Sequence, residues 1–313
     1  MPQLSVVVPV YNEEATVDEL RRRLGEVLDR VEPDYEVLLV NDGSRDGTAE
    51  ALRRIAQAGS RWRAIHFSRN FGHQAAVAAG LRYATGQAVV VMDADLQDPP
   101  ELLEQMLARW REGFEVVYAQ RVSREREGPL KRGLAWLYYR VLRAVSPVDI
   151  PTDTGDFCLM DRKVVDQLIA LPERNRYIRG LRAWVGFRQT SVQFERAPRF
   201  AGEPKYTFRK SLGLGVNGII SFSKAPLRIA TWLGLLVSLM SFVLVIVFVI
   251  EKLTRGFEIR GWASTVVIIL FLGGVQLLTI GIIGEYLSRI YDEVKQRPLY
   301  VVRDTDNTAG ASR

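Results

Sequence analysis

The residues best placed to do chemistry are Asp93, Asp95 and Gln97, three oxygen-bearing side chains spaced two positions apart. They follow an apolar run long enough for one buried strand, and Asp98-Pro99-Pro100 after them is typical of a helix N-cap with proline in the first turn. Carboxylate and amide oxygens suit Mg2+ or Mn2+, which complete their coordination with water and substrate phosphates. The spacing therefore predicts a metal-bound diphosphate, although an isolated Asp-x-Asp also fits a solvated turn.

The elements that must position these side chains alternate in type along the first 120 residues. Helical patterns separate the apolar runs, and the first of them opens with a capping box formed by Thr16 and Glu19. Alternating strands and helices predict an α/β fold with a Rossmann-like, mostly parallel, doubly wound sheet. The predicted strands are 4–10, 35–40, 64–67, 88–92 and 115–119, and the predicted helices are 16–31, 46–56 and 73–84.

Each predicted strand ends in polar residues. The endings are Tyr11-Asn12-Glu13, Asn41-Asp42-Gly43-Ser44, Ser68-Arg69-Asn70, the Asp93 to Gln97 stretch, and Arg121. Ligands of doubly wound sheets bind outside the carboxyl ends of the strands, so five such endings favour a nucleotide diphosphate site over ordinary loop chemistry. The chain has no Gly-x-Gly-x-x-Gly and no Walker A lysine loop, which excludes a Rossmann dehydrogenase and a P-loop enzyme.

Composition narrows the function classes further. The 313 residues carry 42 basic and 36 acidic side chains, and this net charge of +6 suits an anionic ligand or membrane surface without requiring nucleic acid. Cys158 is the only cysteine, and His66 and His73 are the only histidines. An internal disulfide, a cysteine-based zinc site and a histidine-rich metal site are therefore excluded, as expected for a domain in a reducing compartment.

Several motifs, in this order, resemble the family 2 glycosyltransferases of GT-A fold. They are Pro9-Val10-Tyr11-Asn12-Glu13, Asn41-Asp42-Gly43-Ser44 with Asp46, and Asp93-Ala94-Asp95-Leu96-Gln97. Further motifs are similar to the polyprenyl-phosphate branch, which includes dolichyl-phosphate mannosyltransferases and bacterial undecaprenyl-phosphate glucosyltransferases. These are Gly155-Asp156-Phe157, Arg179-Gly180, Trp184-Val185-Gly186-Phe187, Arg199, and Gly202-Glu203-Pro204-Lys205-Tyr206. The resemblance covers nearly the whole chain.

The resemblance implies a role for each matching residue. The base and ribose would be held by Pro9, Tyr11, Glu13 and Asp42, and the nucleotide would be contacted by Asp93 and Ala94. Mg2+ or Mn2+ would be bound by Asp95 and Gln97 beside Asp93. The phosphates would be contacted by Arg121, Arg199 and Lys205. The implied reaction transfers a sugar, with UDP-glucose favoured as donor, to a polyprenyl phosphate with inversion. Cys158 departs from the family, which usually has arginine after Gly-Asp-Phe, so a phosphate contact from that position is in doubt. Cys158 itself is predicted to be a small apolar packing residue.

Asp156 is the candidate base by this resemblance. A phosphate monoester is largely dianionic at neutral pH and hardly needs deprotonating, so Asp156 is equally a candidate for orienting Lys205 or the sugar. Asp95, Asp156, Arg121 and Lys205 are the predicted catalytic residues. Two anions must meet in the reaction, which gives the basic side chains an electrostatic role.

The second half of the chain predicts two membrane spans, residues 229–250 and 262–283, each without a charged residue. Buried core helices are the alternative. Five basic residues shortly before this hairpin and three shortly after it, against three in its loop, predict an integral membrane protein with the catalytic domain and both termini in the cytoplasm. Small residues in the second span, such as Gly273 and Gly281, would permit contact between copies in a homo-oligomer.

The predicted domains are a catalytic domain at 1–200, a juxtamembrane amphipathic segment at 201–228, the hairpin at 229–284 and a cytoplasmic tail at 285–313 that is disordered from residue 304. Segments 129–145 and 208–228 mix apolar and basic residues, which suits either interface helices or packing against the sheet or a second subunit. Two other functions remain open at this point. One is a processive polysaccharide synthase, although Gln105 to Trp110 has one residue too many for a Gln-x-x-Arg-Trp motif; the other is an inactive membrane scaffold.

Overall fold

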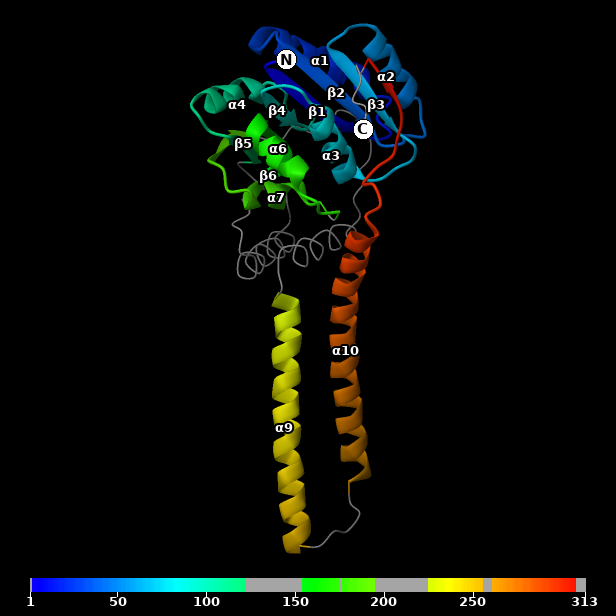
Figure 1. The fold of residues 1–313 in the computed structure, drawn as a ribbon, viewed down its shortest axis with the longest axis vertical. Helices are drawn as coiled ribbons and strands as arrows, with labels where there is room; N and C mark the ends of the chain where they lie inside the picture. Colours follow the sequence, from blue (N-terminus) through cyan, green and yellow to red (C-terminus); the bar gives the residue numbers. More distant parts are fainter. Residues whose placement is uncertain (1, 122–153, 175, 195–224, 256–260, 308–313) are drawn as a thin grey trace.

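A computed structural model describes residues 2–121, 154–174, 176–194, 225–255 and 261–307. One α/β domain is built around a central sheet, and two long helices extend side by side away from it (Figure 1). Arg199, Lys205 and the segments at 129–145 and 208–224 lie outside the described residues.

The sheet has eight strands among the described residues, in the order β7-β5-β6-β4-β1-β2-β3-β8. The five predicted strands are confirmed, with ends that differ from the prediction by at most two residues. They are β1 (Leu4–Val10), β2 (Tyr35–Asn41), β3 (Trp62–Phe67), β4 (Ala88–Val91) and β5 (Val116–Arg121). The sequence pattern did not predict β6 (Thr154–Asp161), β7 (Gln189–Phe194) or β8 (Val302–Asp306). β6 and β8 run antiparallel to their neighbours and the remaining pairs are parallel, so the sheet is mostly parallel as predicted.

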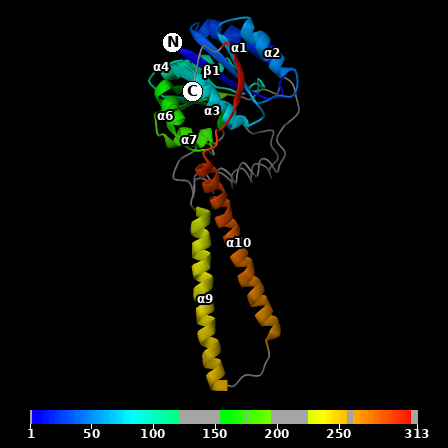
Figure 2. The same ribbon diagram turned by 45° about the vertical axis from the view of Figure 1, so that its right-hand side comes forward.

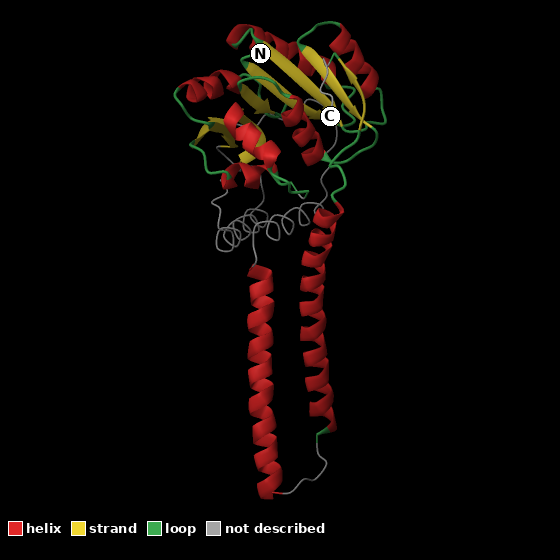
Figure 3. Cartoon of the chain, in the orientation of Figure 1, coloured by secondary structure: helices red, strands yellow, loops and turns green. Residues whose placement is uncertain are grey.

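Helices cover both faces of the sheet (Figure 3). Helices α1 (Val17–Val31), α2 (Thr48–Gln57) and α4 (Leu102–Arg111) pack on the face that includes Val6 and Val8. Helices α3 (His73–Tyr83), α6 (Arg162–Ala170) and α7 (Ile178–Trp184) pack on the face that includes Val7. Gly80 lets α3 lie close to β1, because a Cβ at this position would come within 2.0 Å of the Val7 side chain. All residues of β1 are buried, and neighbouring side chains point alternately into the two cores, as expected for a strand covered on both faces.

The predicted start of the first helix is confirmed, with Thr16 as the N-cap residue of α1. Its capping box with Glu19 does not form, because Thr16 donates its hydroxyl to Glu13 Oε2 at 3.1 Å instead. The predicted helix N-cap at Asp98 is wrong. Helix α4 begins at Leu102 with Glu101 as its N-cap, because the residues after Gln97 continue as turns rather than starting the helix at Asp98. Asp98 is buried at 2% exposure, close to the site.

The chain returns to the domain after the second long helix. β8 pairs antiparallel with β3 at the edge of the sheet, and the Tyr300 ring stacks on Phe67 with centroids 5.0 Å apart. His66 Nε2, on β3, lies 2.9 Å from Asp306 Oδ2 and so holds the far end of β8 as well. The predicted disorder from residue 304 is therefore wrong for Asp304 to Asp306, and residues 308–313 lie outside the described residues.

Helices α9 (Ala225–Arg255) and α10 (Trp262–Lys295) are longer than the two predicted spans, which they contain (Figure 2). At 1.5 Å per residue a helix of about 30 residues exceeds the roughly 30 Å hydrocarbon thickness of a bilayer. Among the described residues, their apolar stretches Leu227–Leu244 and Phe271–Lys295 are 11% and 0% buried inside the molecule. This exposure contradicts the alternative of buried core helices.

Candidate functional site

Asp93 and Asp156 come together because β4 and β6 pair antiparallel. Val91 is the partner of Cys158 in this ladder, so continuing the register by two residues places Asp93 opposite Asp156. The carboxyl end of β4 and the amino end of β6 therefore share one edge of the sheet. This edge also carries the carboxyl ends of β1, β2, β3 and β5.

Two cations complete this group, which we name the Asp156 cluster: His73, Asp93, Asp156 and Arg179. Arg179 donates from Nε to Asp156 Oδ1 at 2.7 Å and from Nη2 to Oδ2 at 3.2 Å. His73 Nε2 lies 3.0 Å from Asp156 Oδ2 and 3.7 Å from Asp93 Oδ1. His73 is the first residue of α3 and Arg179 the second of α7, so two helices on one face of the sheet deliver both cations to Asp156.

The charges of the cluster change the pKa of its members. Burial alone would raise the pKa of Asp156, but the Arg179 guanidinium and the His73 hydrogen bond outweigh it and hold the pKa far below the usual carboxyl range. Burial alone would lower the pKa of His73, but Asp156 and Asp93 raise it to about 8. Desolvation raises the pKa of Asp93, with His73 opposing it. Asp156 is therefore a fixed anion that accepts hydrogen bonds, and a weak base.

The predicted metal ligands lie on the turn after β4. Asp93, Asp95 and Gln97 are partly exposed and alternate with buried Ala94 and Leu96, so the three polar side chains share the accessible side of the turn. Asp95 Oδ1 accepts a hydrogen bond from the Gln97 backbone N–H at 3.2 Å. Leu96 between them has φ +55°, a left-handed conformation that is uncommon for a bulky residue and that clusters at functional sites.

This turn fits a hard divalent cation. Gln97 Oε1 is buried and accepts no hydrogen bond from the described residues, which is costly for a polar atom unless a ligand completes it. Together with the Asp95 carboxylate it forms the oxygen donor set that Mg2+ or Mn2+ prefers. His73, Asp93 and Asp156 also place one ligand atom each within 4.8 Å of one another. Arg179 already occupies both Asp156 oxygens there, so the Asp95 and Gln97 side fits a cation better.

The predicted nucleotide contacts follow β1 and β2. Pro9 lies within β1, and Tyr11 and Glu13 stand on the turn that follows it. Asp42 is buried and accepts hydrogen bonds from the backbone N–H groups of Phe71, at 2.7 Å, and Gly72, at 3.0 Å. Burial raises the pKa of Asp42, and these two donors oppose the shift. Asp42 thus fixes the loop that leads into α3 and His73, and its contact with a base stays a prediction.

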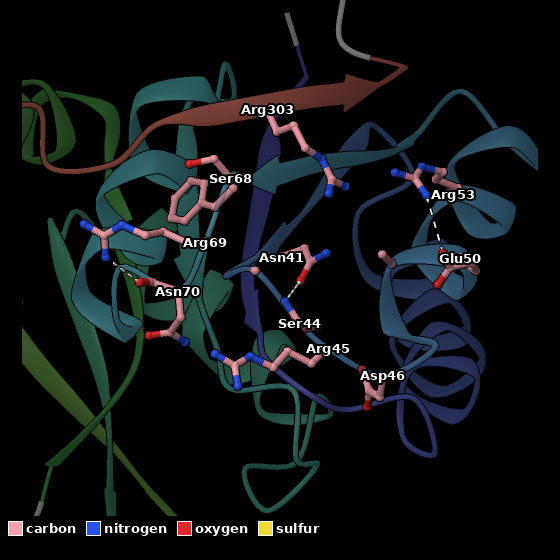
Figure 4. Close-up of a pocket in the computed structure, with 13 residues that line it drawn as sticks. Asn41, Ser44, Arg45, Asp46, Glu50, Arg53, Ser68, Arg69, Asn70 and Arg303 are labelled. Atoms are coloured by element: carbon pink, nitrogen blue, oxygen red, sulfur yellow. Dashed lines mark hydrogen bonds and ion pairs between the residues drawn. The ribbon is translucent and has the colours of Figure 1, made fainter.

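A pocket of about 590 Å³ opens beside Asp42, at the ends of β2 and β3 (Figure 4). Its lining includes Asn41, Gly43 and four arginines, Arg45, Arg53, Arg69 and Arg303. Gly43 has φ +66° and touches the Arg69 backbone so closely that no side chain fits there. The volume lies within the range of small-molecule sites. The pocket does not include the Asp156 cluster, so the sheet edge has two parts, one beside Asp42 and one beside Asp93.

Cys158 is buried at 1% exposure on β6, which confirms the prediction of a packing residue. Burial raises the pKa of its thiol, while Arg182 opposes the shift. Arg182 is itself 1% exposed and lies over the Tyr118 ring at 5.4 Å from its centroid. Arg182 Nε and Nη2 have no hydrogen-bond partner among the described residues. A buried guanidinium is therefore present next to Cys158, supplied by α7 rather than by β6.

The structure thus brings Asp93 and Asp156 together, a contact that was not predicted, with Asp95 and Gln97 on the adjoining turn, and places Arg121 at the end of β5 on the same edge. His73 was not among the predicted site residues, and no role was predicted for Arg179. The signal for His73 was its place directly after the third strand's polar ending, at the start of a predicted helix. Nothing in the local sequence shows that Arg179 reaches Asp156, because this contact depends on how α7 packs.

A mostly parallel α/β sheet with an acidic turn after β4 is the arrangement expected of a GT-A glycosyltransferase. The model of the family "Glycosyl transferase family 2" matches residues 5–169, and that of the "GtrB C-terminal hairpin" matches residues 225–290. The chain belongs to glycosyltransferase family 2, with the hairpin of its GtrB-type members, and is a glycosyltransferase.

Relatives match the chain over nearly its whole length. The uncharacterized glycosyltransferase YkcC of Bacillus subtilis is 50% identical, covering 96% of this chain and 93% of YkcC. The bactoprenol glucosyl transferase of Shigella phage SfV is 40% identical, covering 96% of this chain and 98% of that protein. Among solved structures, the mannosyltransferase PcManGT of Pyrobaculum calidifontis, in complex with GDP-Man and Mn2+, is 24% identical with a TM-score of 0.43, covering 61% of this chain and 55% of that one.

Proposed function

We propose that this glycosyltransferase moves a sugar from a nucleotide sugar, with UDP-glucose the favoured donor, to a polyprenyl phosphate at the cytoplasmic face of a membrane. The observation that carries the proposal is the pairing of the acidic turn after β4 with a hairpin of two exposed apolar helices in one chain. The relatives named bactoprenol glucosyl transferases support a glucosyl donor and a lipid acceptor.

The donor would lie along the carboxyl edge of the sheet. The pocket beside Asp42 would take the nucleoside end, and the Asp95 and Gln97 turn would hold the cation that contacts the diphosphate. Strands are about 4.8 Å apart, so the two strand spacings from β2 to β4 suit an extended diphosphate. When bound, Mg2+ or Mn2+ would neutralise the charge that develops on the leaving nucleoside diphosphate. Arg121, and by resemblance Arg199 and Lys205, would contact the phosphates.

Asp156 would position the side chains of Arg179 and His73 rather than take a proton from the acceptor. Both of its oxygens accept hydrogen bonds from Arg179, and Oδ2 also lies within hydrogen-bond distance of His73. A dianionic acceptor phosphate needs no base, so the acceptor oxygen would attack the anomeric carbon directly and invert its configuration. This assigns Asp156 the orienting role that the sequence left open, with Arg179 and His73 as its partners.

The hairpin would cross the membrane and keep the catalytic domain beside the lipid acceptor. Both α9 and α10 are long and apolar enough for this role, and their apolar windows are exposed to the surroundings. A processive synthase has no support from α4. Its Trp110 donates to Asp161 Oδ2 at 2.8 Å, at the carboxyl end of β6, so the Gln105 to Trp110 stretch packs against the sheet instead of approaching the site.

Purified full-length protein with Mn2+ and undecaprenyl phosphate should transfer label from one member of a panel of nucleotide sugars into the organic phase. UDP-glucose is the expected member, and no label should enter that phase when undecaprenol replaces undecaprenyl phosphate. Label transfer from a different nucleotide sugar would correct the donor and keep the reaction class. No transfer from any donor tested would contradict the proposed function.

A further inference from the structure

We propose that Arg179, held in place by Asp156, forms with His73 the subsite that binds the phosphate of the lipid acceptor. This inference rests on the proposed function and adds to it the residues that receive the second substrate. Arg179 belongs to α7, and the proposed function assigns no substrate contact to the arginines of this helix.

Arg179 has more hydrogen-bond donors than its contacts among the described residues use. A guanidinium carries five N–H bonds. In the described residues Asp156 accepts two of them, and the Thr154 carbonyl oxygen accepts one from Nη1 at 3.2 Å. One N–H on Nη1 and one on Nη2 have no acceptor among the described residues. The side chain is one-third exposed, and the other three bonds already orient its guanidinium.

The charge on α7 also favours an anionic ligand. Arg179 and Arg182 lie three residues apart on α7 and so share one face of the helix, yet Asp156 is the only carboxylate that forms an ion pair with either of them in the described part of the chain. Arg182 is almost fully buried, and its charge has no acidic partner there. His73 Nε2 is directed at Asp156 and also lies 3.7 Å from Asp93 Oδ1 on the β4 side. The α7 side itself thus carries two guanidinium groups against the single carboxylate of Asp156, which suits an anionic ligand.

The position of α7 in the fold also favours the acceptor subsite. In Figures 1 and 2, α7 lies at the end of the domain nearest the two long helices, whereas α1 and α2 lie at the far end. Trp184, the last residue of α7, is 56% exposed, and among the described residues it is the most exposed large hydrophobic side chain outside the hairpin helices. Tryptophan favours the headgroup layer of membranes. One short helix thus carries an exposed aromatic residue at its end, suited to a membrane surface, and the Arg179 guanidinium at its start.

The donor diphosphate is the other phosphate that could use this fork. The proposed cation side chains, Asp95 and Gln97, lie on the turn after β4, whereas Arg179 approaches from α7 and contacts β6. Asp93 stands between the two parts, within 3.7 Å of His73. This arrangement favours two phosphate subsites, the donor's on the β4 turn and the acceptor's on α7.

The test measures binding without turnover, using full-length protein in detergent micelles and farnesyl phosphate as a short acceptor probe. Arg179→Met should weaken farnesyl phosphate binding by about ten- to hundredfold, because two charge-assisted hydrogen bonds are lost. Arg179→Lys should lose part of the affinity, because one ammonium cannot replace a two-donor fork. Nucleotide-sugar affinity with Mn2+ should stay within about twofold in both variants. Farnesol should bind wild type and variants equally.

Arg188→Met is the matched control, since Arg188 is exposed beyond the end of α7 and lies over the Phe114 ring at 5.2 Å. Unchanged farnesyl phosphate affinity in Arg179→Lys would overturn the proposal, as would an equal loss of donor affinity or the absence of phosphate-dependent binding in wild type. If Arg179→Met does not fold, Arg179→Lys decides alone. Phosphate-dependent binding that is lost in the variants, without transfer from any donor, would refute the proposed function while supporting the subsite.

Discussion

Asp95→Ala should lower kcat/KM for lipid glycosylation by about 10³-fold, the largest effect expected for a single substitution in this chain. Asp95 supplies the carboxylate of the proposed cation site and holds the turn that presents Gln97, so its loss removes a ligand and loosens the remaining one. The effect should appear in nucleotide-sugar affinity as well, measured by calorimetry with Mn2+. The measurement for kcat/KM is initial-rate transfer of labelled sugar to undecaprenyl phosphate.

Asp166→Ala on α6 is the control for this substitution, because its side chain is 58% exposed and pairs only weakly, at 3.7 Å, with Arg162. This variant should keep wild-type activity and affinity. An Asp95→Ala enzyme within about tenfold of wild type would show that the β4 turn does not hold an essential cation.

Asp156→Asn should lower kcat by about 10²-fold at every pH between about 5 and 9 without removing an acidic limb, and any alkaline limb due to His73 should move to lower pH, because Asp156 helps raise the His73 pKa to about 8. An asparagine has one acceptor oxygen where Asp156 has two, so Arg179 loses its bidentate partner and His73 competes for the remaining oxygen. The pKa of Asp156 is held below the ordinary carboxyl range, so the residue does not titrate in this interval. The measurement is kcat against pH for wild type and variant.

The same pKa shift sets the sign of the effect on stability. The folded-state pKa of Asp156 is lower than its unfolded value, so its contribution to stability is present above the unfolded value, about 4, and is lost only as the pH falls through the folded value. Asp156→Asn should therefore melt at a lower temperature than wild type throughout the same pH interval. If wild type instead shows an acidic limb in kcat that the variant lacks, Asp156 acts as a general base and the orienting role is wrong.

Local pattern was sufficient to predict the first five strands and their polar endings. Short, continuous apolar runs such as those of β1 and β2 do not have the spacing of an amphipathic helix and so indicate buried strands. The parallel direction of these strands then determines which strand ends share an edge of the sheet. Asp93, Asp95 and Gln97 could be identified because they are neighbours in sequence on a single turn. Their chemistry required no knowledge of long-range contacts.

The remaining members of the Asp156 cluster come together through contacts between distant parts of the chain. Asp156 faces Asp93 because β6 inserts antiparallel between β4 and β5, a placement that strand periodicity does not specify. Arg179 and His73 are 106 residues apart and reach Asp156 only through the packing of α7 and α3. β8 was missed because its residues, Val302 to Asp306, are mostly charged and polar, as suits an edge strand paired to β3 on one side.

The central claim is that the carboxyl edge of the sheet binds a nucleotide sugar through a divalent cation. The most direct measurement is calorimetric titration of full-length protein with UDP-glucose, first with Mn2+ and then after chelation by EDTA. We expect binding with Mn2+, a loss of affinity of about tenfold or more after chelation, and recovery when Mn2+ is restored. Equal affinity in the presence and absence of the cation would contradict the claim.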